Sequence, residues 1–170
     1  KPKQNDYDDH FDEDFFKKNY KIVDENYIKK YFINSKFKDN LHLYLSLTDK
    51  NFKIMDNYNY FVNFSKKKII FKKVKKININ KNFNKNKKIN FLHLKCRKES
   101  FLNTVYNKEP WEDLLIGFQC RVLRYPNQYN ADFWYHFTNI YVSEKNIRFS
   151  SKCSNCDQLL HLVDNILLKT

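Results

Sequence analysis

Lysine is the residue type whose spacing in this sequence points most directly to a chemistry. Residues 66–98 contain fourteen basic side chains and no acidic one. Residues 1–65 contain eleven basic and eleven acidic side chains, and residues 99–170 contain seven and eight. The net charge of +13 therefore arises in about one fifth of the chain. A local excess of this kind creates a positive field that attracts phosphate and other anions.

The candidate anion-binding residues are the lysines that flank and follow a short apolar run at Ile69–Phe71. They are Lys66, Lys67, Lys68, Lys72, Lys73, Lys75, Lys76, Lys81, Lys85, Lys87 and Lys88. Pairs of lysines on either side of the apolar run and Val74 predict a hairpin whose apolar face packs inward and whose ammonium groups face outward. Near an anionic lipid surface each such lysine contributes about 1 kcal/mol.

The residue types of this block favour a phospholipid headgroup over a nucleic acid. Base recognition uses arginine forks and exposed aromatic rings, whereas the block contains Arg97 and, as an exposed ring, Phe83. Lysine supplies compact point charges that suit headgroup phosphates. A nucleic-acid or organellar-ribosome-associated protein is the alternative. Abundant Lys and Asn also reflect A/T-rich codons, so a hairpin that only keeps the protein soluble is a further interpretation.

Cysteine and histidine provide a weaker signal for a metal or redox site. Cys153 and Cys156 form a CxxC pair directly before a predicted helix, where a thiol pKa is lowered. A zinc site would need two further ligands from a set without the expected spacing, namely Cys96, Cys120, His93 and His161. Zinc, a disulfide and ordinary thiols all remain open for the CxxC pair, and we predict no metal and no cofactor.

The sequence contains no recognisable catalytic motif. No Ser or Cys lies in a glycine-flanked turn, and Gly117 is the one glycine in the chain. Loops that bind nucleotide phosphates depend on several glycines, because only glycine adopts their backbone conformations without strain. We therefore predict a protein that is not an enzyme.

Periodicity predicts the elements that position these residues. Apolar residues at helical spacing indicate a helix at 15–33, preceded by a flexible acidic tail at 1–14, with Asp24 as an internal N-cap. Alternation and β-branched or aromatic enrichment then indicate seven strands. The strands are expected at 41–47, 58–64, 69–79, 89–96, 114–124, 133–142 and 146–150.

Two further segments complete the predicted domain of residues 15–170. An amphipathic helix is expected at 156–169, with its apolar stripe against the sheet. The strand at 133–142 places aromatic rings on both faces, so an uncovered face would be a protein-interaction surface. A protein-protein interaction module that uses this strand is the third functional alternative. No apolar stretch approaches the roughly 20 residues of a membrane span.

Seven antiparallel strands followed by one helix is the element order of pleckstrin-homology-like domains, and residues 41–169 resemble that superfold. The resemblance implies a barrel whose open end carries the loops at 49–57, 80–88 and 143–146. In that superfold anionic lipid headgroups or partner peptides bind at this end. Acylated pleckstrin-homology-like proteins of protozoan parasites are a comparison that the A/T-biased composition also suggests.

The combined prediction is a mainly β protein with flanking helices (α+β), built on a seven-stranded antiparallel barrel or sandwich with a C-terminal amphipathic helix. Its predicted function is that of a non-catalytic peripheral membrane adaptor that binds anionic phospholipid headgroups through the Lys-rich hairpin. The expected locations are the cytoplasm or the surface of an internal membrane.

Overall fold

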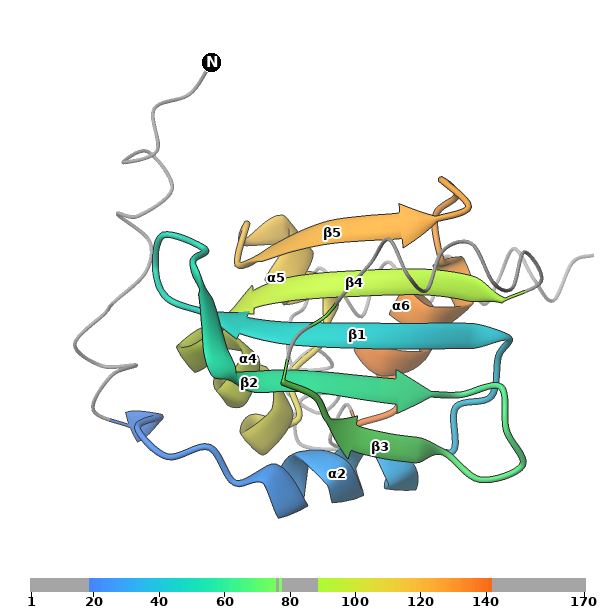
Figure 1. The fold of residues 1–170 in the computed structure, drawn as a ribbon, viewed down its shortest axis with the longest axis horizontal. Coiled ribbons are helices and arrows are strands. Elements are labelled where there is room, and N and C mark those ends of the chain that lie inside the picture. Colours follow the sequence, from blue (N-terminus) through green and yellow to red (C-terminus); the bar gives the residue numbers. More distant parts are fainter. Residues whose placement is uncertain (1–18, 76, 78–88, 142–170) are drawn as a thin grey trace, which may run out of the picture.

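The computed structural model describes residues 19–75, 77 and 89–141, and within them the fold is mixed α+β. Four helices and an open five-stranded sheet make up this part of the chain (Figure 1). The helices are α2 (Glu25–Asn34), α4 (Lys98–Asn107), α5 (Glu112–Ile116) and α6 (Ala131–Asn139). The strands are β1 (Leu41–Thr48), β2 (Ile54–Asn63), β3 (Ile70–Lys73), β4 (Asn90–Arg97) and β5 (Cys120–Tyr125). The predicted α+β class is therefore confirmed.

The sheet has the strand order β3-β2-β1-β4-β5 and contains one parallel pair. β1 and β4 run parallel, in a register that joins Leu41 to Asn90 and Thr48 to Arg97, whereas the other neighbouring strands are antiparallel. The expected all-antiparallel pairing is wrong at this central position. The seven-stranded barrel or sandwich is not confirmed, because the described part of the chain forms an open sheet of five strands.

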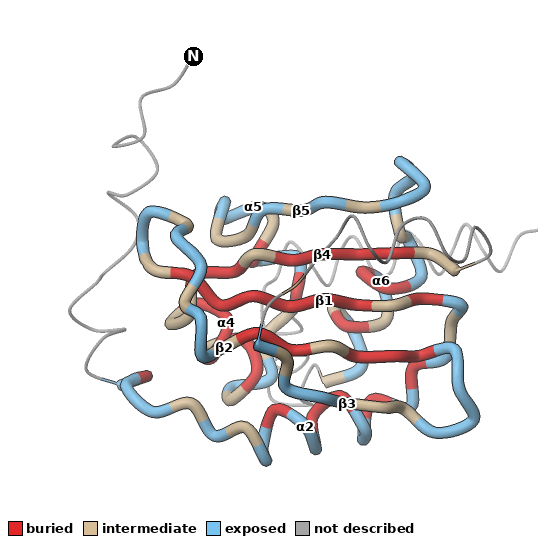
Figure 2. The backbone as a smooth tube through the Cα atoms, viewed as in Figure 1, coloured by how far each residue is buried: buried red, intermediate tan, exposed pale blue. Residues whose placement is uncertain are grey.

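Burial explains why β1 and β4 lie at the centre of the sheet. The leucines of β1 alternate with polar and aromatic residues, and all four of them, Leu41, Leu43, Leu45 and Leu47, have no exposed surface. Alternation of this kind places one set of side chains on one face of the sheet. The described helices all cover that face, and the buried residues concentrate along the central strands (Figures 1 and 2).

An aromatic cluster fills the space between the sheet and the helices. Trp111 is fully buried and its ring contacts the rings of Phe32, Phe133 and Phe137 at centroid distances of 5.0–5.8 Å. Its indole Nε1 donates a hydrogen bond to the Tyr31 hydroxyl at 2.7 Å. That bond satisfies the polar atom that burial of a Trp would otherwise leave without a partner. α2, α5 and α6 are thereby held on one core.

The predicted capping role of Asp24 is confirmed. Its carboxylate Oδ1 accepts a hydrogen bond from the backbone N–H of Tyr27 at 3.0 Å, and α2 begins at the next residue. An oxygen at this position satisfies one of the backbone donors that have no partner inside the first helical turn. Residues 15–18 of the expected helix lie outside the described residues.

The strands expected at 41–47, 58–64 and 89–96 correspond to β1, β2 and β4. Of the strand expected at 69–79, the described residues form β3 at Ile70–Lys73, and residues 76, 78 and 79 lie outside the described part. The segment 114–124 is wrong as a single strand, because α5 ends at Ile116 and β5 begins at Cys120. Helix α4 was not predicted.

Residues 133–139 of the aromatic segment belong to helix α6, so the strand predicted at 133–142 is wrong. α6 buries Phe133, Trp134 and Phe137 at helical spacing and leaves Tyr135 73% exposed. Five consecutive rings, from Phe133 to Phe137, satisfy both a period of 2 and a period of 3.6, so the pattern alone did not decide between them.

Several predicted segments lie outside the described residues. They are the tail at 1–14, the loop at 80–88, the strand at 146–150 and the helix at 156–169. Among the helices that the structure does describe, none is both long enough and apolar enough to span a bilayer.

Alanine substitutions in α6 distinguish the helix from the predicted strand. Phe137→Ala should lower the free energy of unfolding by about 3–5 kcal/mol, because it removes a fully buried ring. Tyr135→Ala should change it by no more than about 0.5 kcal/mol, since that side chain is exposed. Urea unfolding of both variants measures the two values. A strand would place both residues on one face, so comparable losses would contradict the helix.

Candidate functional site

The predicted lysines that the structure describes lie on one edge of the sheet. Lys66, Lys67 and Lys68 occupy the turn between β2 and β3, and all three are exposed. Lys72 and Lys73 lie on β3, and Lys75 follows it. The remaining five predicted residues are outside the described part, namely Lys76, Lys81, Lys85, Lys87 and Lys88.

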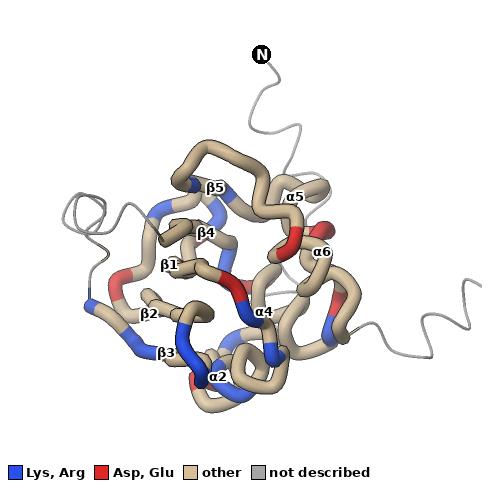
Figure 3. The backbone as a smooth tube through the Cα atoms, turned by 90° about the vertical axis from the view of Figure 1, so that its right-hand side faces the viewer, with Lys and Arg blue, Asp and Glu red and all other residues tan. Residues whose placement is uncertain are grey.

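Helix α2 and the segment after it add lysines that lie outside the basic block at 66–98. Lys29 and Lys30 are exposed on the helix, and Lys36 and Lys38 are exposed on the segment that joins it to β1. An ion pair between Lys73 and Glu25 connects β3 to α2 at 2.5 Å. We call the combined set the lysine edge: Lys29, Lys30, Lys36, Lys38, Lys66, Lys67, Lys68, Lys72, Lys73 and Lys75. Basic residues gather along β3, its preceding turn and α2 in the lower part of the view in Figure 3.

One corner of the lysine edge contains a surface pocket of about 410 Å³. We call it the corner pocket, and its lining residues are Lys38, Asp39, Asn40, Ser65, Lys66 and Lys67. The three lysines come from two segments that are far apart in the sequence, the α2–β1 connection and the β2–β3 turn. The Asp39 carboxylate accepts a hydrogen bond from the backbone N–H of Asn40 at 2.6 Å. Three positive charges therefore surround the pocket, with one carboxylate among them.

Hydrogen bonds fix the turn that carries two of these lysines. The side-chain Oδ1 of Asn63 accepts bonds from both the backbone N–H and the hydroxyl of Ser65, each at 2.8 Å. Asn side chains stabilise turns in this way because they imitate a backbone acceptor. The pKa of His42 is lowered, mainly by burial and also by the positive charge of Lys66. The bonds to Asn63 therefore hold the backbone of the turn from which Lys66 and Lys67 extend.

A second polar cluster lies on the sheet face that the described helices leave uncovered. Asn59 Nδ2 donates to the backbone oxygen of Asp56 at 3.1 Å, which leaves its Oδ1 to accept the Ser46 hydroxyl at 2.7 Å. The 3.0 Å contact between Ser46 Oγ and His93 Nε2 then requires the imidazole proton on Nε2. The hydroxyl proton of Ser46 thus points to Asn59, and His93 is the donor rather than the base.

His93 is buried, and its surroundings lower its pKa. Its side chain is 2% exposed, and within the described residues its Nδ1 has no hydrogen-bond partner. Burial, with a smaller contribution from the charge of Lys95, lowers the pKa of His93 to about 4. The imidazole is therefore neutral at physiological pH.

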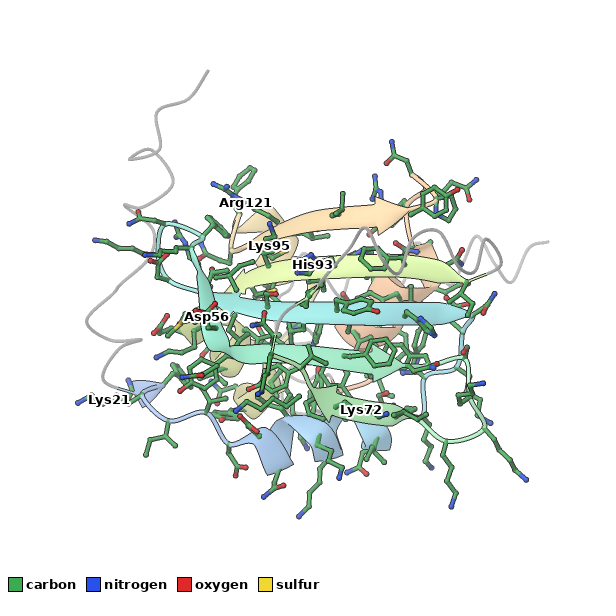
Figure 4. The ribbon with its side chains drawn as sticks, in the orientation of Figure 1. Lys21, Asp56, Lys72, His93, Lys95 and Arg121 are labelled. Carbon is green, nitrogen blue, oxygen red and sulfur yellow. The ribbon has the colours of Figure 1, made fainter. Side chains whose placement is uncertain are left out.

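Basic residues also meet at the end of this face near the β1–β2 turn. Lys95 and Arg121 lie directly opposite each other on β4 and β5, an arrangement that is destabilising for like charges. The guanidinium groups of Arg97 and Arg121 lie 5.0 and 4.3 Å from the centroid of the Phe52 ring. Figure 4 shows His93 and Lys95 on β4 and Arg121 on the neighbouring strand. Cation–π contacts with Phe52 offset part of the repulsion.

The other candidate sites receive no support within the described residues. No group of three or more His, Cys, Asp or Glu side chains in this part of the chain could hold a metal ion. The CxxC pair of Cys153 and Cys156 lies outside it. The predicted interaction surface at 133–142 is replaced by α6, whose most exposed ring is Tyr135.

Comparison with curated proteins shows a partial similarity to an enzyme. The chain is 32% identical over 114 residues to cytidine monophosphate-N-acetylneuraminic acid hydroxylase from Sus scrofa. The match covers 66% of this chain and 24% of that protein, so the chain spans about a quarter of the length of the curated relative it matches. No protein-family model matches the sequence, and no solved structure matches it significantly. The resemblance to pleckstrin-homology-like domains stays a prediction.

The state of His93 predicts a component of acid sensitivity. Its pKa is about 4 in the folded protein and about 6.5 in an unfolded chain, so the unfolded state binds the proton first as pH falls. The free energy of unfolding should decrease by about 3 kcal/mol from this residue between pH 7 and pH 4. His93→Gln retains an N–H donor for Ser46 and should give a shallower pH dependence in urea unfolding. An imidazole that titrates near pH 6.5 in NMR spectra would contradict this.

Proposed function

We propose that the protein is a non-catalytic peripheral adaptor that binds anionic phospholipid headgroups through the lysine edge. The observation that carries the proposal is the corner pocket, in which three lysines from two separate segments line a space of about 410 Å³. Phosphate oxygens accept several charge-assisted hydrogen bonds at once, so such a pocket suits a headgroup phosphate.

The charge distribution around the pocket supports the same function. The ten lysines of the lysine edge are accompanied by Glu25, which is paired with Lys73, and by Asp39. Each lysine that reaches an anionic membrane surface contributes about 1 kcal/mol, so a few of them together produce reversible binding. The proposal does not depend on a pleckstrin-homology-like barrel, because the pocket is lined by the chain that enters β1 and by the turn between β2 and β3.

A second candidate function follows from the partial similarity to the hydroxylase. That protein is named for a substrate, a cytidine monophosphate sugar, that carries a phosphodiester and a carboxylate. The same pocket lysines would bind such an anion, and the chain would then act beside a catalytic domain. The two candidates share the phosphate and differ in whether it is free in solution or fixed at a membrane.

Vesicle binding tests the first candidate. The protein should bind phosphatidylcholine vesicles that contain phosphatidylserine more tightly than pure phosphatidylcholine vesicles, and added salt should weaken binding. Replacing three pocket lysines at about 1 kcal/mol each, in K38Q/K66Q/K67Q, should reduce the affinity about 100-fold in co-sedimentation. The control K21Q/K53Q/K108Q removes the same charge from exposed positions away from the pocket and should retain most of the binding.

Equal losses in the two triple variants would contradict a defined headgroup site and indicate a response to net charge alone. Competition with single-stranded RNA across a salt series separates the nucleic-acid alternative. If RNA displaces the protein from vesicles at every salt concentration, nucleic acid replaces lipid as the partner of the lysine edge.

Calorimetric titration with cytidine monophosphate-N-acetylneuraminic acid tests the second candidate. Saturable binding by the unmodified protein, abolished in K38Q/K66Q/K67Q and kept in K21Q/K53Q/K108Q, would favour it over the membrane. Absence of heat together with binding to anionic vesicles would remove it. The two experiments use the same proteins, so their outcomes can be compared directly.

A further inference from the structure

Cys96 and Cys120 lie directly opposite each other in the antiparallel pair of β4 and β5. Both are free thiols, Cys96 with no exposed surface and Cys120 partly exposed. Their side chains point to the same face of the sheet, where both belong to or pack against the core. The sequence gives no hint of this pair, because the two residues do not have the spacing of a redox or metal motif.

The hydrogen-bond register fixes the distance between the two backbones. The backbone N–H of Arg97 donates to the carbonyl of Gln119 at 3.0 Å, so the adjacent pair of Cys96 and Cys120 occupies a position without cross-strand backbone bonds. Opposed Cα atoms at such positions are about 4.5 Å apart, and their side chains are closest there. A disulfide spans Cα separations of about 4.4–6.8 Å. The separation typical of this position therefore lies within the range that a disulfide spans.

The thiols already interact. The side chains of Cys96 and Cys120 share a hydrogen bond, and that bond, together with burial, raises the pKa of the Cys96 thiol. Because Cys120 is the more exposed of the two, its sulfur is the one that a reagent from solution reaches first.

We propose that Cys96 and Cys120 form a site of oxidative modification in which a hydroperoxide converts the two thiols into a cross-strand disulfide. The Cys120 sulfur attacks the peroxide oxygen, the O–O bond breaks, and a sulfenic acid and an alcohol or water result. The Cys96 sulfur then attacks the Cys120 sulfur, and the hydroxyl leaves with the Cys96 proton as water. Two thiols and one peroxide thus give one disulfide, one alcohol or water, and one further water.

The modification would act on an edge of the sheet. β5 is the last strand, and within the described residues it pairs only with β4. A covalent link at Cys120, the first residue of β5, would hold the strand to its neighbour where the chain leaves α5. This site is remote from the lysine edge, which lies at the opposite side of the sheet, so the inference is independent of the proposed function.

The experiment uses the full chain with the CxxC pair replaced, C153S/C156S, so that two thiols remain. Brief treatment with hydrogen peroxide should remove two hydrogen atoms from the intact mass and both thiols from a dithionitrobenzoate assay. Peptide mapping should locate the bond between Cys96 and Cys120, and dithiothreitol should reverse it. Amide exchange in β5 should become several-fold slower in the oxidised protein.

Substitution of one partner provides the control. C120S/C153S/C156S retains Cys96 alone, and its buried thiol should stay reduced under the same treatment. Overoxidation of Cys120 to a sulfinic acid in place of a disulfide, or a disulfide that links two molecules, would overturn the proposal. So would two thiols that remain titratable after the peroxide treatment.

Discussion

The parallel register between β1 and β4 is the constraint on which the rest of the structure depends. It joins two strands whose core-facing residues have no exposed surface, among them Leu43, Leu45, Leu92 and Leu94. A parallel pair cannot be closed by a tight turn, so the chain must leave β3 and return at the other side of β1. That crossover leaves β3 at one edge of the sheet and β5 at the other. The edge position of β3 exposes its lysines, and the edge position of β5 brings Cys120 opposite Cys96.

The same register explains the contrast between the two faces of the sheet. One face carries leucines and packs against the aromatic cluster around Trp111, which needs no polar partner beyond the Tyr31 hydroxyl. On the other face the register places His93 next to Tyr44 and within reach of Ser46. Burial of polar groups there is tolerated because Ser46 and Asn59 satisfy one another. The low pKa of His93 follows from this arrangement, because the buried cluster accommodates the neutral imidazole and not the charged form.

Short-range sequence patterns correctly predicted the elements that depend on interactions between neighbouring residues. The strands β1, β2 and β4 and the Asp24 cap were found because alternation and capping act within a few residues. The parallel partner of β1 was not found, because strand pairing over some fifty residues leaves no local mark. The strand predicted at 133–142 was wrong for another reason. The ring-rich sequence of α6 fits both the strand period and the helix period, and only the packing of Phe133 and Phe137 against the core decides between them. The block at 66–98 identified six of the ten lysines of the lysine edge, whereas Lys38 belongs to it only through tertiary structure.

Protection of the sheet edge accounts for only part of this lysine pattern. Natural sheets place lysine on edge strands to prevent pairing with other chains, and Lys72 and Lys73 on β3 meet that need. The turn lysines do not, because Lys66 and Lys67 precede β3 and take no part in its strand pairing. Lys38 does not protect the sheet edge either, because it belongs to the segment that leads into the central strand β1. Their convergence on one pocket places like charges together at an energetic cost, and an anion in that pocket would remove the repulsion.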